Sequence, residues 1–272
     1  MKPKKYVHGY SRREKTRLFD QANTLSELLH HDSIFPPGSR VLEAGCGVGA
    51  QTIILALKNP RVFFTSTDIS QDSLEQASGL IQRTKLKNVQ FHLADIFNLP
   101  FKASSFDHVF VCFVLEHLPR PLDALARLIK VLKPGGSMTV IEGDHGSTYF
   151  HPESELADRT IQCLIDVQKI LGGNALIGRQ LFPLLKQAGF KNISVSPRMV
   201  YVDSSRPELE EGFTRNTFTA MVKGVKQQAL SLKMMTEKDW DQGIKDLHRT
   251  ASSNGTFCYT FFKGTGIKPA SK

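Results

Sequence analysis

The sequence is poor in cysteine and contains no long apolar run. Its 272 residues include four widely separated cysteines that form no C-x-x-C pair: Cys46, Cys112, Cys163 and Cys258. Neither a zinc site nor a disulfide framework is therefore predicted. No stretch approaches the roughly 18 uninterrupted apolar residues of a membrane-spanning helix, and no apolar segment follows the basic N-terminus as in a secretory signal. We expect a cytoplasmic protein with no membrane span and no bound metal.

The composition is that of a globular protein with a positive net charge. A hydrophobic content of 40% with 22% charged residues is ordinary for a chain that folds around a core. The length suits one large α/β domain, or a core domain with an appended cap. The net charge of +9 could indicate an acidic partner. A solvated basic face is favoured, because charges beyond the basic N-terminus are mixed in sign and show no basic–aromatic alternation, so nucleic acid is not the expected partner.

Apolar segments of strand length alternate with helical segments from residue 39 to residue 146. The expected strands are 39–44, 61–70, 89–96, 106–118 and 137–145, and the expected helices between them are 51–59, 72–85 and 121–136. An earlier helix is expected at 16–31. Such alternation is typical of a doubly wound, Rossmann-like α/β fold with a parallel sheet.

The alternation breaks down after Gly146. Two largely helical segments flank a strand at 191–203, and a last apolar run near the C-terminus predicts a closing strand. The expected organisation is an N-terminal arm and helix (1–35), a core (36–146), a helical cap insertion (147–174), a continuation of the core (175–206), a second helical cap insertion (207–252), and a closing strand with a tail (253–272).

The segment VLEAGCGVGA, residues 41–50, predicts a ligand-binding turn between the first strand and its helix. Glycines there allow close approach of the backbone to a ligand, and the helix N-terminus favours an anionic group. Gly45, Gly47 and Ala50 also satisfy the dinucleotide pattern G-x-G-x-x-G/A, and Asp68 after the second strand suits the ribose of either ligand class. Glu43 is expected inside the turn, where its negative charge favours a ligand with an ammonium group over a pyrophosphate.

The order of motifs resembles that of class I S-adenosylmethionine-dependent methyltransferases, in the small-molecule branch that includes quinone-biosynthesis enzymes. The resemblance runs from Arg40 to Phe190 and rests on VLEAGCGVGA, STDIS, HLADIFNLPF, FDHVFVCFVLEHL, LKPGG and LLKQAGF. It implies S-adenosyl-L-methionine as cofactor and a seven-stranded sheet of order 3-2-1-4-5-7-6 with the seventh strand antiparallel. The segment FCYTFF would belong to that seventh strand.

The resemblance also implies which residues bind the cofactor. Glu43, Gly45 and Gly47 would hold its methionine end. Asp68 would accept hydrogen bonds from the ribose hydroxyls, and Ile69 would pack on the adenine.

Further contacts implied by the resemblance lie before and after these residues. Asp95 and Ile96 would contact the adenine amine and ring, and Phe113 would lie along the methionine portion. Tyr10, with Arg12 or Arg13, could close over the methionine carboxylate, although a surface arm with a buried tyrosine is an equal alternative.

Five candidates for proton transfer follow the fourth and fifth strands, at the open rim where substrate is expected to enter: Glu116, His117, Glu142, Asp144 and His145. Methyl transfer mostly requires alignment of the acceptor and exclusion of water, and a base is needed only for a protonated acceptor. His145 is the predicted catalytic base because an imidazole exchanges protons near neutral pH. Proximity alone is the alternative, and Glu116 with His117 could merely begin a helix.

Aromatic and methionine residues of the insertions could line an apolar acceptor pocket or form the core of the cap. They are Tyr149, Phe150, Phe213, Phe218, Met221, Met234, Met235 and Trp240. The predicted function is methyl transfer to an O, N or C atom of a small molecule. The alternatives are methylation of RNA or protein, and a catalytically inactive regulator that binds S-adenosylmethionine.

Overall fold

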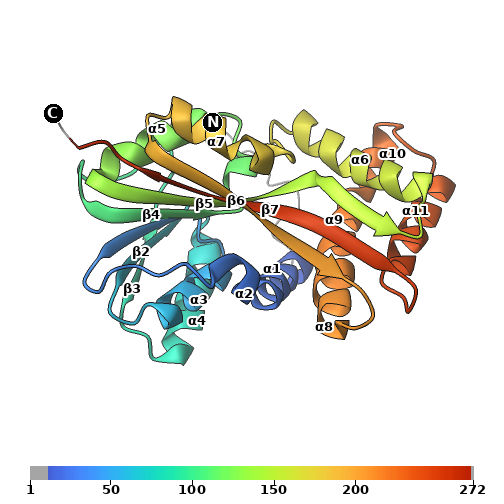
Figure 1. Cartoon of the computed structure of the whole chain (residues 1–272), viewed down its shortest axis with the longest axis horizontal. Helices are drawn as coiled ribbons and strands as arrows, with labels where there is room; N and C mark the ends of the chain where they lie inside the picture. Colours follow the sequence, from blue (N-terminus) through green and yellow to red (C-terminus); the bar gives the residue numbers. More distant parts are fainter. Residues whose placement is uncertain (1–11, 271–272) are drawn as a thin grey trace. The chain divides into compact units, whose positions relative to one another are not determined.

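The computed structural model describes residues 12–270, which contain a seven-stranded mixed sheet of order β3-β2-β1-β4-β5-β7-β6 (Figure 1). The strands are β1 (Arg40–Ala44), β2 (Phe63–Asp68), β3 (Val89–Leu93), β4 (Phe106–Cys112), β5 (Leu132–His151), β6 (Lys191–Val202) and β7 (Thr256–Ile267). Helices follow β1, β2 and β4 along the chain, whereas β3 leads to β4 without one, and such helical crossovers are typical of parallel strands. The predicted fold class and strand order are confirmed.

The pairing directions follow the predicted pattern. The strands β1 to β5 pair in parallel, with β1 between β2 and β4. Between β5 and β7, the Gly135 amide donates to the Lys268 carbonyl, and farther along β5 the Thr260 amide donates to the Ser147 hydroxyl. Residues later in β5 therefore pair with residues earlier in β7, so β7 runs antiparallel to β5.

The chain divides into two compact units, each with its own core. The core unit comprises Ser26–Glu142, Ile177–Arg198 and Phe262–Lys272, and the insertion unit comprises Met1–Leu25, Gly143–Leu176 and Met199–Phe261. Helical elements of the core unit are α2 (Ser26–His30), α3 (Ala50–Lys58), α4 (Gln71–Thr84), η1 (Leu115–His117), α5 (Pro121–Val131), η2 (Ile177–Gln180) and α7 (Leu181–Gln187). Those of the insertion unit are α1 (Arg12–Thr24), α6 (Glu155–Ile170), α8 (Pro207–Leu209), the π-helix η3 (Glu210–Thr219), α9 (Ala220–Lys223), α10 (Lys226–Ser231) and α11 (Glu237–Arg249).

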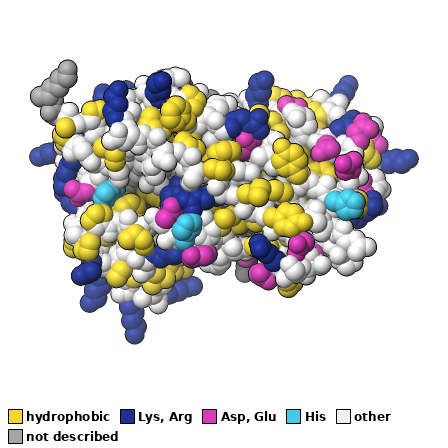
Figure 2. Space-filling view, viewed as in Figure 1, with side chains coloured by type: hydrophobic (Ala, Val, Ile, Leu, Met, Phe, Trp, Pro, Cys, Tyr) yellow, Lys and Arg dark blue, Asp and Glu magenta, His cyan; other side chains and the backbone are white. Residues whose placement is uncertain are grey.

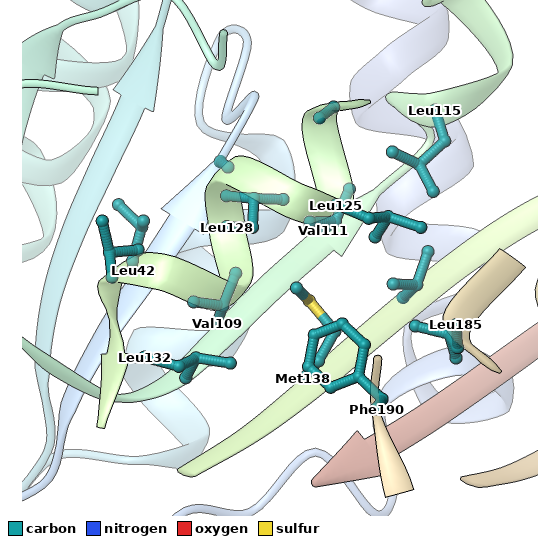
Figure 3. Close-up of a cluster of buried hydrophobic side chains, with 14 of the residues drawn as sticks. Leu42, Val109, Val111, Leu115, Leu125, Leu128, Leu132, Met138, Leu185 and Phe190 are labelled. Atoms are coloured by element: carbon teal, nitrogen blue, oxygen red, sulfur yellow. The ribbon is translucent and has the colours of Figure 1, made fainter. Parts of the chain in front are cut away.

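In the core unit, α3 and α4 cover one face of the sheet, and α5 and α7 cover the other (Figure 1). Apolar residues of α5 recur at helical spacing and are buried: Ala124, Leu125, Leu128 and Val131. They join side chains of β4, β5 and α7 in one cluster, including Val109, Met138 and Leu185 (Figure 3). Each large apolar side chain buried in this way contributes about 1.5–3 kcal/mol. Because Ala44 of β1 and Val111 of β4 belong to the same cluster, this packing holds the carboxyl ends of these two strands.

The strand β5 is longer than the sequence pattern indicates. The pattern predicts residues 137–145, whereas β5 extends to His151, so residues 147–151 are strand and not the start of a helical insertion. The Ser147 hydroxyl accepts from the Thr260 amide and donates to the Asp144 carbonyl. The extension therefore depends on a partner more than a hundred residues away, which a local pattern does not reveal.

In the insertion unit, α6 packs closely on α11. A Cβ atom at Gly243 would lie 2.4 Å from the Leu156 carbonyl oxygen, so only glycine permits this approach of the two helices. Trp240 on α11 is 1% exposed. Within residues 12–270, no helix combines the length and the apolar character that a membrane crossing needs.

Candidate functional site

The glycine-rich turn after β1 has three glycines in the left-handed region. Their φ angles are +82° at Gly45, +53° at Gly47 and +82° at Gly49. A Cβ at Gly45 would lie 2.4 Å from Val114 Cγ2, and one at Gly49 would lie 2.9 Å from Ala77 Cβ. At Gly47 a Cβ would meet no atom of the described residues within 4 Å. Gly45 and Gly49 are thus required by the protein's own packing, and the backbone at Gly47 faces open space that a ligand can enter.

Glu43 lies in β1 and not within the turn, so the expectation of a turn carboxylate needs correction. Its side chain is 2% exposed, and its Oε2 atom accepts hydrogen bonds of 2.7 Å from the Thr52 and Ser66 hydroxyls. Among the described residues, Oε1 forms no hydrogen bond. Burial raises the pKa of Glu43 to about 7. The carboxyl is therefore held by β2 and α3, with one oxygen left for a cationic group.

Asp68 at the end of β2 braces the glycine-rich turn. Its Oδ2 accepts from the Gly47 amide at 2.8 Å, and its Oδ1 accepts from the Ser70 amide at 2.9 Å. Burial raises its pKa, and these amides oppose that shift. Each carboxylate oxygen can accept a further hydrogen bond. The arrangement is compatible with the predicted contact to ribose hydroxyls.

The three residues predicted beside the adenine differ in exposure. Ile69 is 62% exposed directly after Asp68, so its apolar side chain is open to a ligand. Asp95 is exposed, and its Oδ1 accepts from the Phe97 amide at 2.8 Å. Ile96 packs partly against the core cluster. Ile69 and Asp95 therefore remain available to a ligand, whereas part of the Ile96 side chain packs against the core.

The turn after β4 faces the glycine-rich turn. Phe113 has a φ of 58°, which is uncommon for a bulky residue, and its amide donates to the Ile141 carbonyl at 2.9 Å. The next side chain, Val114, occupies the space against Gly45. The structure thus brings Phe113 to the same end of the sheet as the glycines, as predicted from their positions after neighbouring strands.

Four of the five candidates for proton transfer are buried, which corrects the expectation of an open rim. The exposed fractions are 7% for Glu116, 0% for Glu142, 1% for Asp144 and 3% for His145, and His117 is half-buried. The reason is that Glu142, Asp144 and His145 lie inside the long β5 and not after its end.

His145 lies in an aromatic cluster of the insertion unit. Its Nδ1 atom is 2.7 Å from the Tyr259 hydroxyl, and its ring meets Phe218 edge to face. Phe213 and Phe257 pack on the same group of rings. The sequence pattern gives no sign of the Tyr259 partner, because the two residues are 114 positions apart.

Most cap residues considered for an acceptor pocket serve the core of the insertion unit. Phe213, Phe218, Met235 and Trp240 are nearly fully buried. Phe150 stacks on Phe257 with ring centroids 6.3 Å apart. Met221 and Met234 are half-buried, and Tyr149 is 73% exposed. Tyr10 lies outside the described residues.

Comparison with known proteins decides the family. The model of a family described as "methyltransferase domain" matches residues 36–194, more than half of the chain. The chain belongs to this methyltransferase family. The family and its relatives show that its cofactor is S-adenosylmethionine, as predicted.

Two relatives illustrate the similarity of this methyltransferase to curated proteins. Demethylmenaquinone methyltransferase of Staphylococcus aureus is 32% identical over 134 residues, which cover 49% of this chain and 55% of that protein. An uncharacterized 37.1 kDa protein in a transposon of Streptomyces fradiae is 35% identical over 192 residues, covering 69% and 54%. The methyltransferase thus spans about half the length of the curated relatives it matches.

A solved structure supports the same fold. Phosphoethanolamine N-methyltransferase 2 of Haemonchus contortus, in complex with phosphomonomethylethanolamine and S-adenosylhomocysteine, has a TM-score of 0.58 and 18% identity to this methyltransferase. The match covers 91% of this chain and 52% of that one. At this identity the likeness shows the fold alone.

The residues of the core unit fit S-adenosylmethionine. Open space at Gly47 admits a ligand to the backbone. The Oε1 atom of Glu43 can accept from an ammonium group, and the exposed Ile69 offers an apolar surface to a purine. By contrast, Cys46 and Cys112 are buried free thiols whose pKa is raised by burial, so they stay neutral and serve packing.

Proposed function

We propose that this methyltransferase transfers a methyl group from S-adenosylmethionine to an O, N or C atom of a small-molecule acceptor. The similarity to demethylmenaquinone methyltransferase carries the proposal, because that relative is named for a small-molecule acceptor. The charge distribution supports it: Lys and Arg side chains are interspersed with acidic and apolar side chains over the visible face (Figure 2). No continuous basic surface that would suit nucleic acid is evident on that face.

In the proposed site, the residues of the core unit bind and orient the cofactor. Glu43 and the backbone at Gly45 and Gly47 hold the methionine end, and Asp68 accepts from the ribose. Ile69, Asp95 and Ile96 recognise the adenine, and Phe113 lies along the methionine portion. The bound cofactor supplies an electrophilic methyl group on a sulfonium, so the protein's task is alignment and exclusion of water.

His145 remains the proposed base for a protonated acceptor. For this role its Nδ1–H must donate to the Tyr259 oxygen, because only then can Nε2 take a proton. His145→Gln is expected to lower kcat by about a hundredfold, within the range for a lost general base, with little change in the KM for S-adenosylmethionine. Tyr149→Phe, at an exposed tyrosine, serves as the control. An unchanged kcat in His145→Gln would show that alignment alone suffices.

The acceptor class is tested by labelled methyl transfer into a cell extract. The extract is incubated with the protein and S-adenosylmethionine that carries a labelled methyl group, and is then separated into small-molecule, RNA and protein fractions. We expect enzyme-dependent label in the small-molecule fraction. Label confined to RNA or protein would contradict the proposed acceptor, and an Asp68→Ala sample controls for endogenous enzymes.

A further inference from the structure

Glu142 is a buried acid with an unusual set of contacts. Its side chain is 0% exposed, and its Oε1 atom accepts from the Val114 amide at 3.0 Å and from the Leu115 amide at 2.7 Å. Its Oε2 atom is enclosed and has no hydrogen-bond partner among residues 12–270. Oε1 thus accepts two hydrogen bonds, whereas Oε2 receives none of the hydrogen bonds that a buried ionised oxygen requires.

The two amides belong to the turn that forms one wall of the proposed cofactor site. Val114 fills the space against Gly45, where a Cβ would collide with it. The preceding residue, Phe113, has its backbone in the left-handed region, a conformation that persists only when the surroundings hold it. Glu142 therefore connects β5 to the turn at the point where the turn touches the glycines.

The charges that face Glu142 disfavour its ionised form. Glu116 of η1 is 7% exposed and lies close enough to repel a second carboxylate, and the Cys112 thiol of β4 also faces Glu142. His117 Nε2 is 3.5 Å from Glu116 Oε1, and a protonated His117 offsets part of that charge. Burial and the Glu116 charge raise the pKa of Glu142 well above its ordinary value, while the backbone amides of Leu115, Val114 and Glu116 oppose the rise.

We propose that Glu142 is a positioning residue that acts as a neutral carboxylic acid and holds residues 113–115 in the form that binds the cofactor. The proposal rests on the placement of Phe113 along the methionine portion. It gives Glu142 a role in affinity for the cofactor without contact to the reacting atoms. It also explains why an acid occupies a fully buried position: the carbonyl oxygen accepts from two amides that would otherwise be unsatisfied.

The binding test compares Glu142→Leu, Glu142→Gln and the wild type by calorimetric titration with S-adenosylhomocysteine at pH 7. Glu142→Leu leaves two buried amides without an acceptor and is expected to lose affinity at least tenfold. Glu142→Gln keeps the acceptor and should stay within about twofold of the wild type. Glu75→Leu replaces an exposed glutamate of α4 and should change nothing.

The protonation state is tested by the pH dependence of stability. At neutral pH the unfolded chain has lost the Glu142 proton and the folded protein keeps it, so this group makes the wild type less stable as pH rises above about 4.5. Glu142→Gln lacks this contribution. Its melting temperature relative to the wild type should therefore increase between pH 5 and pH 8. This measurement needs neither cofactor nor acceptor.

Three results would overturn the inference. The first is a melting-temperature difference independent of pH, and the second is a Glu142→Gln protein that binds as poorly as Glu142→Leu. The third is unchanged affinity in Glu142→Leu when the wild type binds S-adenosylhomocysteine. Methyl label found in macromolecules would contradict only the proposed acceptor, because none of these measurements involves an acceptor.

Discussion

Asp68→Ala is expected to weaken the binding of S-adenosylhomocysteine by about a thousandfold. In the proposed site the carboxylate accepts from the ribose hydroxyls, and in the structure it also accepts from the Gly47 and Ser70 amides. A hydrogen bond to a charged group contributes about 1.5–3 kcal/mol. Losing two of them costs about 4 kcal/mol, or about a thousandfold in affinity. Loss of the hydrogen bond from the Gly47 amide to Asp68 also weakens binding.

Isothermal titration with S-adenosylhomocysteine measures this effect. Asp72→Ala is the matched control, because Asp72 is an exposed aspartate in the first turn of α4, four residues farther along the chain. A circular dichroism spectrum confirms that each variant is folded. If Asp68→Ala binds within a few-fold of the wild type, the ribose contact is misplaced and the proposed orientation of the cofactor fails.

Gly45→Ala is expected mainly to lower stability, whereas Gly47→Ala is expected mainly to weaken cofactor binding. At Gly45 the new Cβ would lie 2.4 Å from Val114 within the core unit, so we expect a loss of stability of about 3 kcal/mol or more from overpacking and the unfavourable φ. At Gly47 a Cβ would contact no atom in the part of the chain that the structure describes. The stability loss there should be only about 1 kcal/mol, while the methyl group blocks the approach of the cofactor.

Chemical denaturation and calorimetric titration together distinguish the two variants. Gly47→Ala should unfold close to the wild-type midpoint but show no measurable binding of S-adenosylhomocysteine. Gly38→Ala is the control, because Gly38 also has a positive φ and open space around its Cβ position but lies before β1. Normal binding in Gly47→Ala would mean that the open space beside this backbone is not the cofactor site.

The strands and helices of the core were predictable because the local spacing of apolar residues indicates each of them. The parallel half of the sheet and the glycine-rich turn follow from segments of ten to fifteen residues. Asp68 and Asp95 could be found in the same way, since each lies at the end of an expected strand and the carboxyl ends of parallel strands meet at one edge. The resemblance to a known family added the strand order and the cofactor.

The partners of the functional groups could not be predicted from local patterns. Glu43 is held by Thr52 and Ser66, nine and 23 residues away, and Gly45 is required by Val114. No periodicity connects such positions, because they meet only when α3, β2 and the turn after β4 pack on β1. The expectation that Glu43 lies in the turn was wrong, because β1 extends to Ala44 and includes Glu43.

Local sequence therefore specifies which residues can form each strand, helix and turn, and which carboxylates stand at strand ends. Backbone conformation and side-chain chemistry over a few residues are sufficient for that. The surroundings of Glu142 and His145 depend instead on distant segments: the turn after β4 meets Glu142, and Tyr259 of β7 meets His145. Whether a carboxyl is ionised or an imidazole reaches solvent is set by desolvation and by facing charges, and the packed tertiary structure alone determines both.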